Sequence, residues 1–160
     1  MKLFLKRVLS DDVGFQIYDD LGNCRYSAIV ETESSRQRII LTGDSVVPVS
    51  EILHKSFLMR YFTVRCQAGF FVLLPSMRDC FSFRIYGSSY RFAGDASSGS
   101  FSLFDVDKSV IMTQKKCWCR YGDAYELNIL VPEDEHFALS VAICADLYIS
   151  ATEASTVLSG

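Results

Sequence analysis

The feature that most constrains the fold is a stretch near the C-terminus that is apolar on all sides. Residues 137–149 read FALSVAICADLYI, with Ser140 and Asp146 as the polar positions. A helix without a polar face is buried all round, so the rest of the chain must surround it. Pro132 and the acidic Glu133, Asp134 and Glu135 predict the helix start, because proline presets φ and carboxylates favour the positive end of the helix dipole.

Before Pro132 the chain reads as short alternating segments separated by turn signals. Apolar residues at every second position predict strands, and Gly, Asp, Asn and Ser between them predict tight turns. The predicted strands are residues 2–7, 15–18, 24–31, 38–42, 46–54, 61–66, 70–74, 81–85, 90–92, 101–104, 110–116 and 125–131. Pro48 marks an edge or a bulge in its strand. This spacing is typical of a barrel or a sandwich.

A closed barrel of about twelve antiparallel strands has an interior too wide for strand side chains alone to fill. The apolar helix fills it if it runs through the middle, as in other strand cans with a central helix. We therefore predict a mainly β (α+β) domain over residues 2–151, followed by a short polar tail at 152–160. The alternative, a helix lying on an open sheet, requires a polar stripe, and Ser140 and Asp146 make a poor one.

Composition and charge narrow the class of protein. The 160 residues are 49% hydrophobic and 22% charged, which excludes a disordered chain. The 16 basic and 19 acidic residues give a net charge of −3, which argues against a nucleic-acid binder. The N-terminus has no apolar core of a signal peptide, and no run is long enough to span a membrane. With six irregularly spaced cysteines, we expect free thiols and a cytoplasmic protein.

Several motifs together resemble the LURP-one-related family of the tubby C-terminal-like superfamily. They are, in order, residues 18–23 (YDDLGN), 90–95 (YRFAGD), 107–116 (DKSVIMTQKK), 121–127 (YGDAYEL) and 132–135 (PEDE), followed by the apolar helix ending at Asp146. The resemblance implies a twelve-stranded barrel closed around a central C-terminal helix. It implies no established activity, although superfamily relatives bind phosphoinositides or act on membrane phospholipids.

The first functional hypothesis is a non-enzymatic binding module for anionic phospholipid at a membrane surface, or for a protein partner. Charge is uneven along the chain: residues 39–94 carry six basic and three acidic groups, whereas residues 95–160 carry four basic and ten acidic groups. The candidate lipid-binding residues are Lys55, Arg60, Arg65, Lys115 and Lys116. A basic face that gathers Lys55, Lys115 and Lys116 would support this hypothesis, and it would make the cytoplasmic protein peripheral to the membrane.

Asp146 is the second candidate site, because a carboxylate on a buried helix must be paired or protonated. An ion pair with an arginine from a strand would make it structural, and this is the favoured interpretation. A cavity at the barrel mouth would instead make it part of a site. That second arrangement, or a pocket with Cys117 or Cys119 within hydrogen-bond reach of a histidine, would favour an enzyme. A large exposed apolar patch or a stable dimer would favour a structural or interaction protein.

Metal and catalytic motifs are weak. Cys117 and Cys119 share a strand face and could hold zinc with His136 and Cys144, but their spacing is shorter than zinc pairs usually show. Calcium candidates have a simpler role in turns or at the helix dipole; they are Asp19, Asp20, Asp105, Asp107, Glu133, Asp134 and Glu135. Neither a Gly-x-Ser-x-Gly motif nor a phosphate-binding Gly-rich loop is present. We therefore predict no catalytic residues, no metal and no cofactor.

Overall fold

The computed structural model describes residues 1–9, 14–55, 60–76, 78 and 80–159. Within these residues the chain forms twelve strands, a short 3-10 helix and one α-helix. The strands are β1 (Lys2–Val8), β2 (Gly14–Asp19), β3 (Cys24–Glu33), β4 (Arg36–Thr42), β5 (Pro48–Lys55), β6 (Tyr61–Cys66), β7 (Gly69–Ser76), β8 (Phe81–Tyr86), β9 (Arg91–Asp95), β10 (Ser100–Phe104), β11 (Val110–Cys119) and β12 (Gly122–Ile129). The helices are η1 (Pro132–Asp134) and α1 (Glu135–Ser159).

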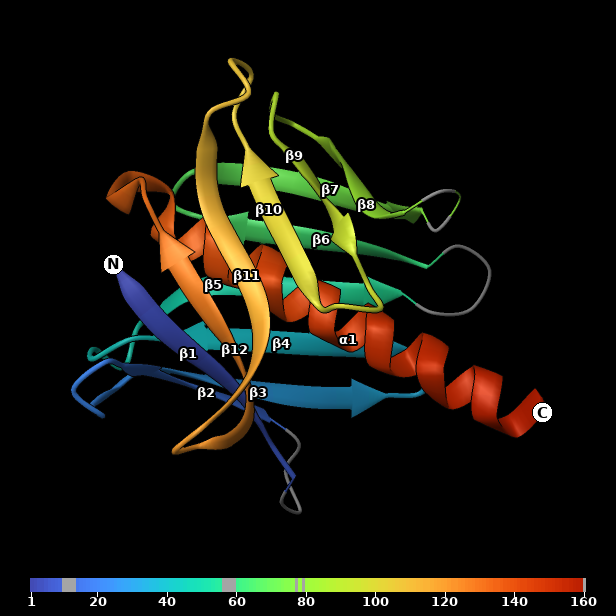
Figure 1. The fold of residues 1–160 in the computed structure, drawn as a ribbon, viewed down its shortest axis with the longest axis horizontal. Helices are drawn as coiled ribbons and strands as arrows, with labels where there is room; N and C mark the ends of the chain where they lie inside the picture. Colours follow the sequence, from blue (N-terminus) through green and yellow to red (C-terminus); the bar gives the residue numbers. More distant parts are fainter. Residues whose placement is uncertain (10–13, 56–59, 77, 79, 160) are drawn as a thin grey trace.

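The twelve described strands close into one antiparallel barrel in which every strand pairs with its sequence neighbours. The first and last strands close the ring, with Leu3 opposite Leu127 and Leu5 opposite Tyr125. Figure 1 shows α1 running through the middle of the barrel. The predicted architecture is therefore confirmed.

The first half of α1 is the centre of the core. Every residue from Phe137 to Ala145 is fully buried, Ser140 included. The strands meet the helix with alternating apolar positions: Phe81, Phe83 and Ile85 of β8, for example, all face inward. Burying each such side chain stabilises the fold by about 1.5–3 kcal/mol, so the helix and the inner wall hold each other in place.

Ser140 explains how an apolar helix tolerates a hydroxyl. Its Oγ donates to the carbonyl of His136 at 2.8 Å and lies 2.6 Å from Oγ of Ser50 on β5. Because the Ser140 proton goes to the backbone, Ser50 donates to Ser140. Both buried hydroxyls are therefore satisfied, and together they fix the helix against one wall of the barrel.

The structure differs from the sequence prediction at the end of the helix. Residues 152–159, expected as a polar tail, continue α1 and project from the barrel (Figure 1). Val157 and Leu158 there are 81% and 89% exposed. Within Pro132–Leu158 an 18-residue window has a mean hydropathy of 1.4, so by length and composition this span could cross a membrane, but 61% of that window is buried inside the barrel.

Candidate functional site

The barrel has two mouths with different surroundings. At the start mouth, where α1 begins, two tyrosines hydrogen-bond to the residues around the helix start. Tyr26, near the beginning of β3, donates to Glu135, and Tyr90, just before β9, donates to Asp134. Around the exit mouth, where α1 leaves, lie the end of β1, the start of β4 and the end of β5, as the antiparallel order requires. The β11–β12 turn instead reaches back to the turn after β2.

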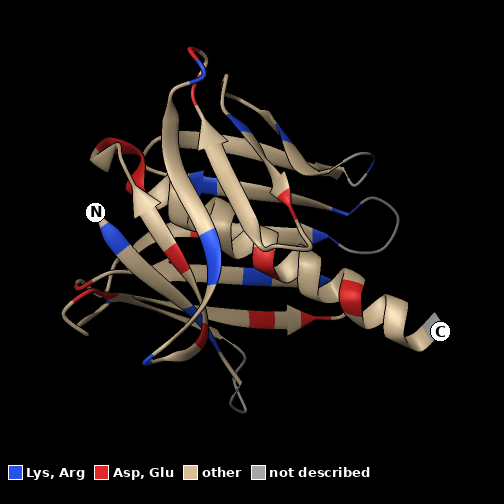
Figure 2. Cartoon of the chain, viewed as in Figure 1, with Lys and Arg blue, Asp and Glu red and all other residues tan. Residues whose placement is uncertain are grey.

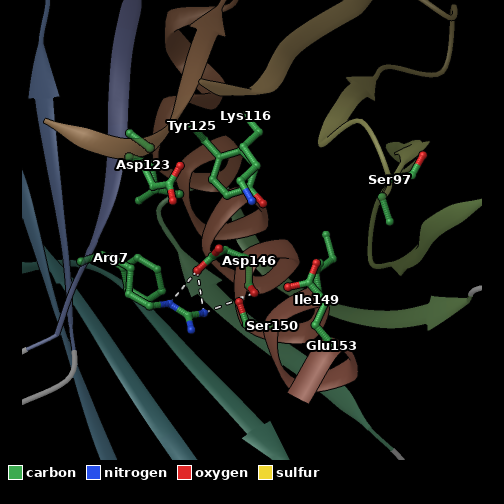
Figure 3. A pocket seen from close by; sticks show the side chains of 13 residues that line it. Arg7, Ser97, Lys116, Asp123, Tyr125, Asp146, Ile149, Ser150 and Glu153 are labelled. Carbon is green, nitrogen blue, oxygen red and sulfur yellow. Dashed lines mark hydrogen bonds and ion pairs between the residues drawn. The ribbon is translucent and has the colours of Figure 1, made fainter. Parts of the chain in front are cut away.

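A pocket of about 200 Å³ opens beside α1 at the exit mouth (Figure 3). Alternation along the strands places Arg7, Lys116 and Tyr125 on the inner face just beyond the packed core. The helix contributes Asp146, Ser150 and Glu153. The lining residues are Leu5, Arg7, Phe15, Ala96, Ser97, Lys116, Asp123, Ala124, Tyr125, Asp146, Ile149, Ser150 and Glu153.

An ion pair between Arg7 and Asp146 forms one wall of this pocket. The Arg7 guanidinium donates to Asp146 Oδ2 from Nε at 2.9 Å and approaches the same oxygen with a terminal nitrogen at 2.6 Å. The same nitrogen donates to the Asp146 carbonyl at 3.3 Å. The two side chains are 28% and 13% exposed, so the pair is largely shielded from water. Asp146 is therefore both paired with a strand arginine and part of the mouth pocket.

Burial sets the protonation behaviour of the pocket. It raises the pKa of Asp146, and the positive charges of Arg7 and Lys116 offset part of that rise. Burial, followed by the nearby carboxylates of Asp146 and Glu153, raises the pKa of Tyr125 to about 12. The lining residues of the pocket supply charged groups and hydroxyls, and neither histidine nor cysteine is among them.

The five predicted basic residues do not form one face, so the expected cluster of Lys55, Lys115 and Lys116 is absent. Strands β5 and β11 lie diametrically opposite in the ring. Lys55 and Arg60 lie at the exit mouth, and Lys116 lines the pocket across that mouth. Lys115 points outward opposite Glu126, and Arg65 lies toward the start mouth with its guanidinium over Phe70.

A different basic row replaces that cluster. Arg36 at the start of β4 lies directly opposite Lys55 at the end of β5, and both are exposed on the outer face. Arg60 and Arg78, also exposed, lie in the next two connections around the same rim, just before β6 and between β7 and β8. Figure 2 shows basic segments in these connections. Glu33 is the cross-strand neighbour of Arg36. None of the four basic residues forms an ion pair with another described residue.

Three of the acidic residues considered for calcium, Asp19, Asp134 and Glu135, serve local structure at the start mouth. Asp19 accepts hydrogen bonds from the backbone N–H groups of Leu21 and Asn23 in its turn. Tyr26 donates to Glu135 at 2.8 Å, and Tyr90 donates to Asp134 at 2.7 Å. These tyrosines anchor the beginning of α1 to the barrel wall.

The zinc candidates are not brought together. Cys144 is fully buried within α1, His136 lies at the start mouth, and Cys117 and Cys119 lie on the far end of β11. Across the part of the chain that the structure describes, no three His, Cys, Asp or Glu residues are grouped closely enough to hold a metal ion.

A cysteine and a histidine share a hollow at the start mouth instead. Cys66 and His136 both line this space of about 430 Å³, together with Ser50 and Arg65. Burial raises the pKa of the Cys66 thiol, which disfavours the nucleophilic thiolate. The arrangement that was expected to favour an enzyme, Cys117 or Cys119 beside a histidine, is not seen among the described residues.

His54 is a buried polar residue that the sequence did not single out. Its ring stacks on Phe62 with centroids 4.2 Å apart, and Nδ1 donates to Gln37 Oε1 at 3.0 Å. Nε2 is buried without a partner among the described residues. Burial, and then the positive charge of Arg60, lower the pKa of His54. A histidine on an alternating strand gives no sequence signal that separates this role from an ordinary core position.

No protein-family model, curated protein or solved structure matches this chain. The resemblance to the LURP-one-related family therefore stays a prediction, carried by the motifs in the sequence.

Proposed function

We propose that the protein is a non-enzymatic binding module whose exit mouth docks on an anionic membrane surface. The observation that carries the proposal is the row of Arg36, Lys55, Arg60 and Arg78 around that mouth, beside the projecting end of α1. The family resemblance agrees with it, because superfamily relatives bind or act on membrane phospholipids.

The basic row is costly for the barrel alone. Arg36 and Lys55 are directly opposite each other on neighbouring strands, and like charges in that arrangement destabilise a sheet. Neither of these two charges is neutralised by an ion pair with another described residue. Near an anionic leaflet each such group contributes about 1 kcal/mol of binding, so the same row becomes favourable at a membrane.

The end of α1 supplies the apolar part of the contact. Val157 and Leu158 are almost fully exposed where the helix leaves the barrel on the side of the basic row (Figures 1 and 2). Exposed apolar side chains at the same mouth as a basic row match the membrane interface, where acyl chains lie beneath anionic headgroups.

The start mouth carries many acidic residues, and this difference between the two mouths orients the molecule relative to an anionic membrane surface. Acidic side chains there come from the turns after β2 and β10 and from η1, namely Asp19, Asp20, Asp105, Asp107, Glu133 and Asp134. Because an anionic surface repels this end and attracts the basic row, the field of the whole molecule turns the exit mouth toward the membrane.

The test is flotation of the purified protein with vesicles of phosphatidylcholine alone or mixed with phosphatidylglycerol, at low and high salt. We expect salt-sensitive binding to the anionic vesicles only. The double variant Arg36→Glu, Lys55→Glu should bind about 30-fold more weakly, since two groups at about 1 kcal/mol each are lost. Arg25→Glu, an exposed arginine at the start of β3, is the matched control and should bind as the parent does.

Calcium provides a further arm of the same experiment. Because the acidic residues before α1 hold tyrosine hydroxyls, binding should not depend on calcium. Failure of the parent to float with anionic vesicles, or equal losses in the rim variant and in Arg25→Glu, would exclude the proposal and leave a protein partner as the ligand.

A further inference from the structure

Two arginines face each other on the outer wall of the barrel, away from the exit mouth pocket. Arg84 of β8 is the cross-strand partner of Arg91 of β9. Their neighbours Phe83 and Phe92 are buried in the core, so both arginines project outward, and both are exposed.

Nothing described on this wall neutralises the two charges. Neither arginine forms an ion pair with another described residue, and their next neighbours in the same cross-strand row are Leu74 and Phe104. Directly opposed like charges destabilise a sheet by a few tenths to about 1 kcal/mol. A dianion bound between the two guanidinium groups would replace their mutual repulsion by a net attraction.

The wall is hollowed at this point. A space of about 520 Å³ is lined by both arginines, by Ser76 and Ser82, and by the outward-facing Leu74. Ser76 and Ser82 are themselves opposite each other, in the row that adjoins the arginine pair. The hollow therefore combines two planar cations, two hydroxyls and an apolar border.

We propose that this hollow binds the phosphate monoester group of a small organic ligand. Each guanidinium can donate two parallel hydrogen bonds to phosphate oxygens, and two such forks match the double charge of the monoester. Ser76 and Ser82 supply further donors, and Leu74 contacts the organic group. This site shares no residue with the basic row of the exit mouth and does not depend on the proposed membrane docking.

The test uses phenyl phosphate as the probe, titrated by calorimetry into the full-length protein. We expect Arg84→Gln and Arg91→Gln each to weaken its binding at least tenfold. Arg25→Gln, which removes an exposed arginine from another wall, should bind like the parent. Phenyl sulfate, a monoanion of similar shape, should bind at least tenfold more weakly than phenyl phosphate.

Two further measurements separate a binding role from a structural one. The free Arg84→Gln variant should melt at or above the temperature of the parent, because it loses a like-charge pair, yet phenyl phosphate should no longer raise its melting temperature. Binding to the parent should weaken below about pH 6, where the monoester takes up its second proton.

A phospholipid is a second source of the same chemistry. Vesicles with phosphatidic acid carry a phosphate monoester, whereas those with phosphatidylglycerol do not. An Arg91-dependent preference for phosphatidic acid identifies the lipid as the source, and binding of phenyl phosphate without that preference identifies a soluble ester. Unchanged affinity for phenyl phosphate in both glutamine variants, or equal affinity for phenyl sulfate, overturns the proposal whether or not the protein docks on membranes.

Discussion

At the scale of single residues, the pair of Arg7 and Asp146 shows how a carboxylate is kept on a buried helix. Asp146 is 13% exposed, so the free-energy cost of removing its charge from water is offset only while Arg7 is paired with it. We expect Arg7→Met to lower the free energy of unfolding by about 2 kcal/mol at pH 7, because it leaves a shielded carboxylate unpaired. Urea unfolding at neutral pH measures this loss.

The pH dependence of the stability of Arg7→Met tests whether the unpaired Asp146 carboxylate causes the loss. Without the arginine the pKa of Asp146 rises further above its ordinary value, so the folded state binds a proton more readily than the unfolded state. The stability of the variant should therefore recover relative to the parent as pH falls from 7 toward 5. Adding Asp146→Asn should restore most of the loss at pH 7; a double variant as unstable as Arg7→Met would contradict this account.

His54 leads to the opposite pH dependence of stability: its contribution falls, rather than recovers, as the pH is lowered. Burial lowers its pKa below the ordinary 6.5, so the folded state resists protonation. Its effect is therefore a loss of stability as pH falls below about 6.5, at no more than roughly 1.4 kcal/mol per pH unit. Unfolding curves for His54→Leu between pH 7 and 5 should show a shallower decline than the parent. An identical decline would mean that other groups control acid sensitivity.

At the scale of elements, α1 is held at its beginning by two tyrosines. Tyr26→Phe and Tyr90→Phe should each reduce stability by about 1–2 kcal/mol, since each removes a hydrogen bond to a carboxylate. Burial and Asp134 raise the pKa of Tyr90 from 10 to about 12, so its contribution should be complete below pH 10 and lost as pH rises toward 12. Tyr86→Phe, on the half-exposed outer wall, is the control and should change stability little.

The elements themselves were predictable because each carries a local pattern. Alternation located all twelve strands, and the all-round apolar run 137–149 required them to enclose a helix. The end of α1 was missed, because residues 152–159 are polar enough to read as a tail while still helical. The extension of β11 to Cys119 was missed for a similar reason. An exposed hairpin has no buried face, so apolar and polar residues do not alternate along its strands.

At the scale of the whole molecule, the candidate sites depended on information that the sequence does not hold locally. Asp146 was singled out by its chemistry, but Arg7 lies 139 positions away and no local pattern links them. Arg36 meets Lys55, and Arg84 meets Arg91, only through cross-strand register, which a one-residue slip would abolish. The expected grouping of Lys55 with Lys115 failed because ring closure places their strands on opposite walls.

Docking through the exit mouth fixes the orientation of the whole molecule on a membrane, and the single tryptophan allows a direct measurement of that orientation. On a Trp118→Phe background, Leu158→Trp moves the only tryptophan to the exposed end of α1, and Val106→Trp moves it to the acidic start mouth. Tryptophan fluorescence is then recorded with anionic vesicles that contain brominated lipid. Docking through the exit mouth predicts strong quenching for Leu158→Trp and little for Val106→Trp. Equal quenching of both, or stronger quenching at the start mouth, would contradict docking through the exit mouth.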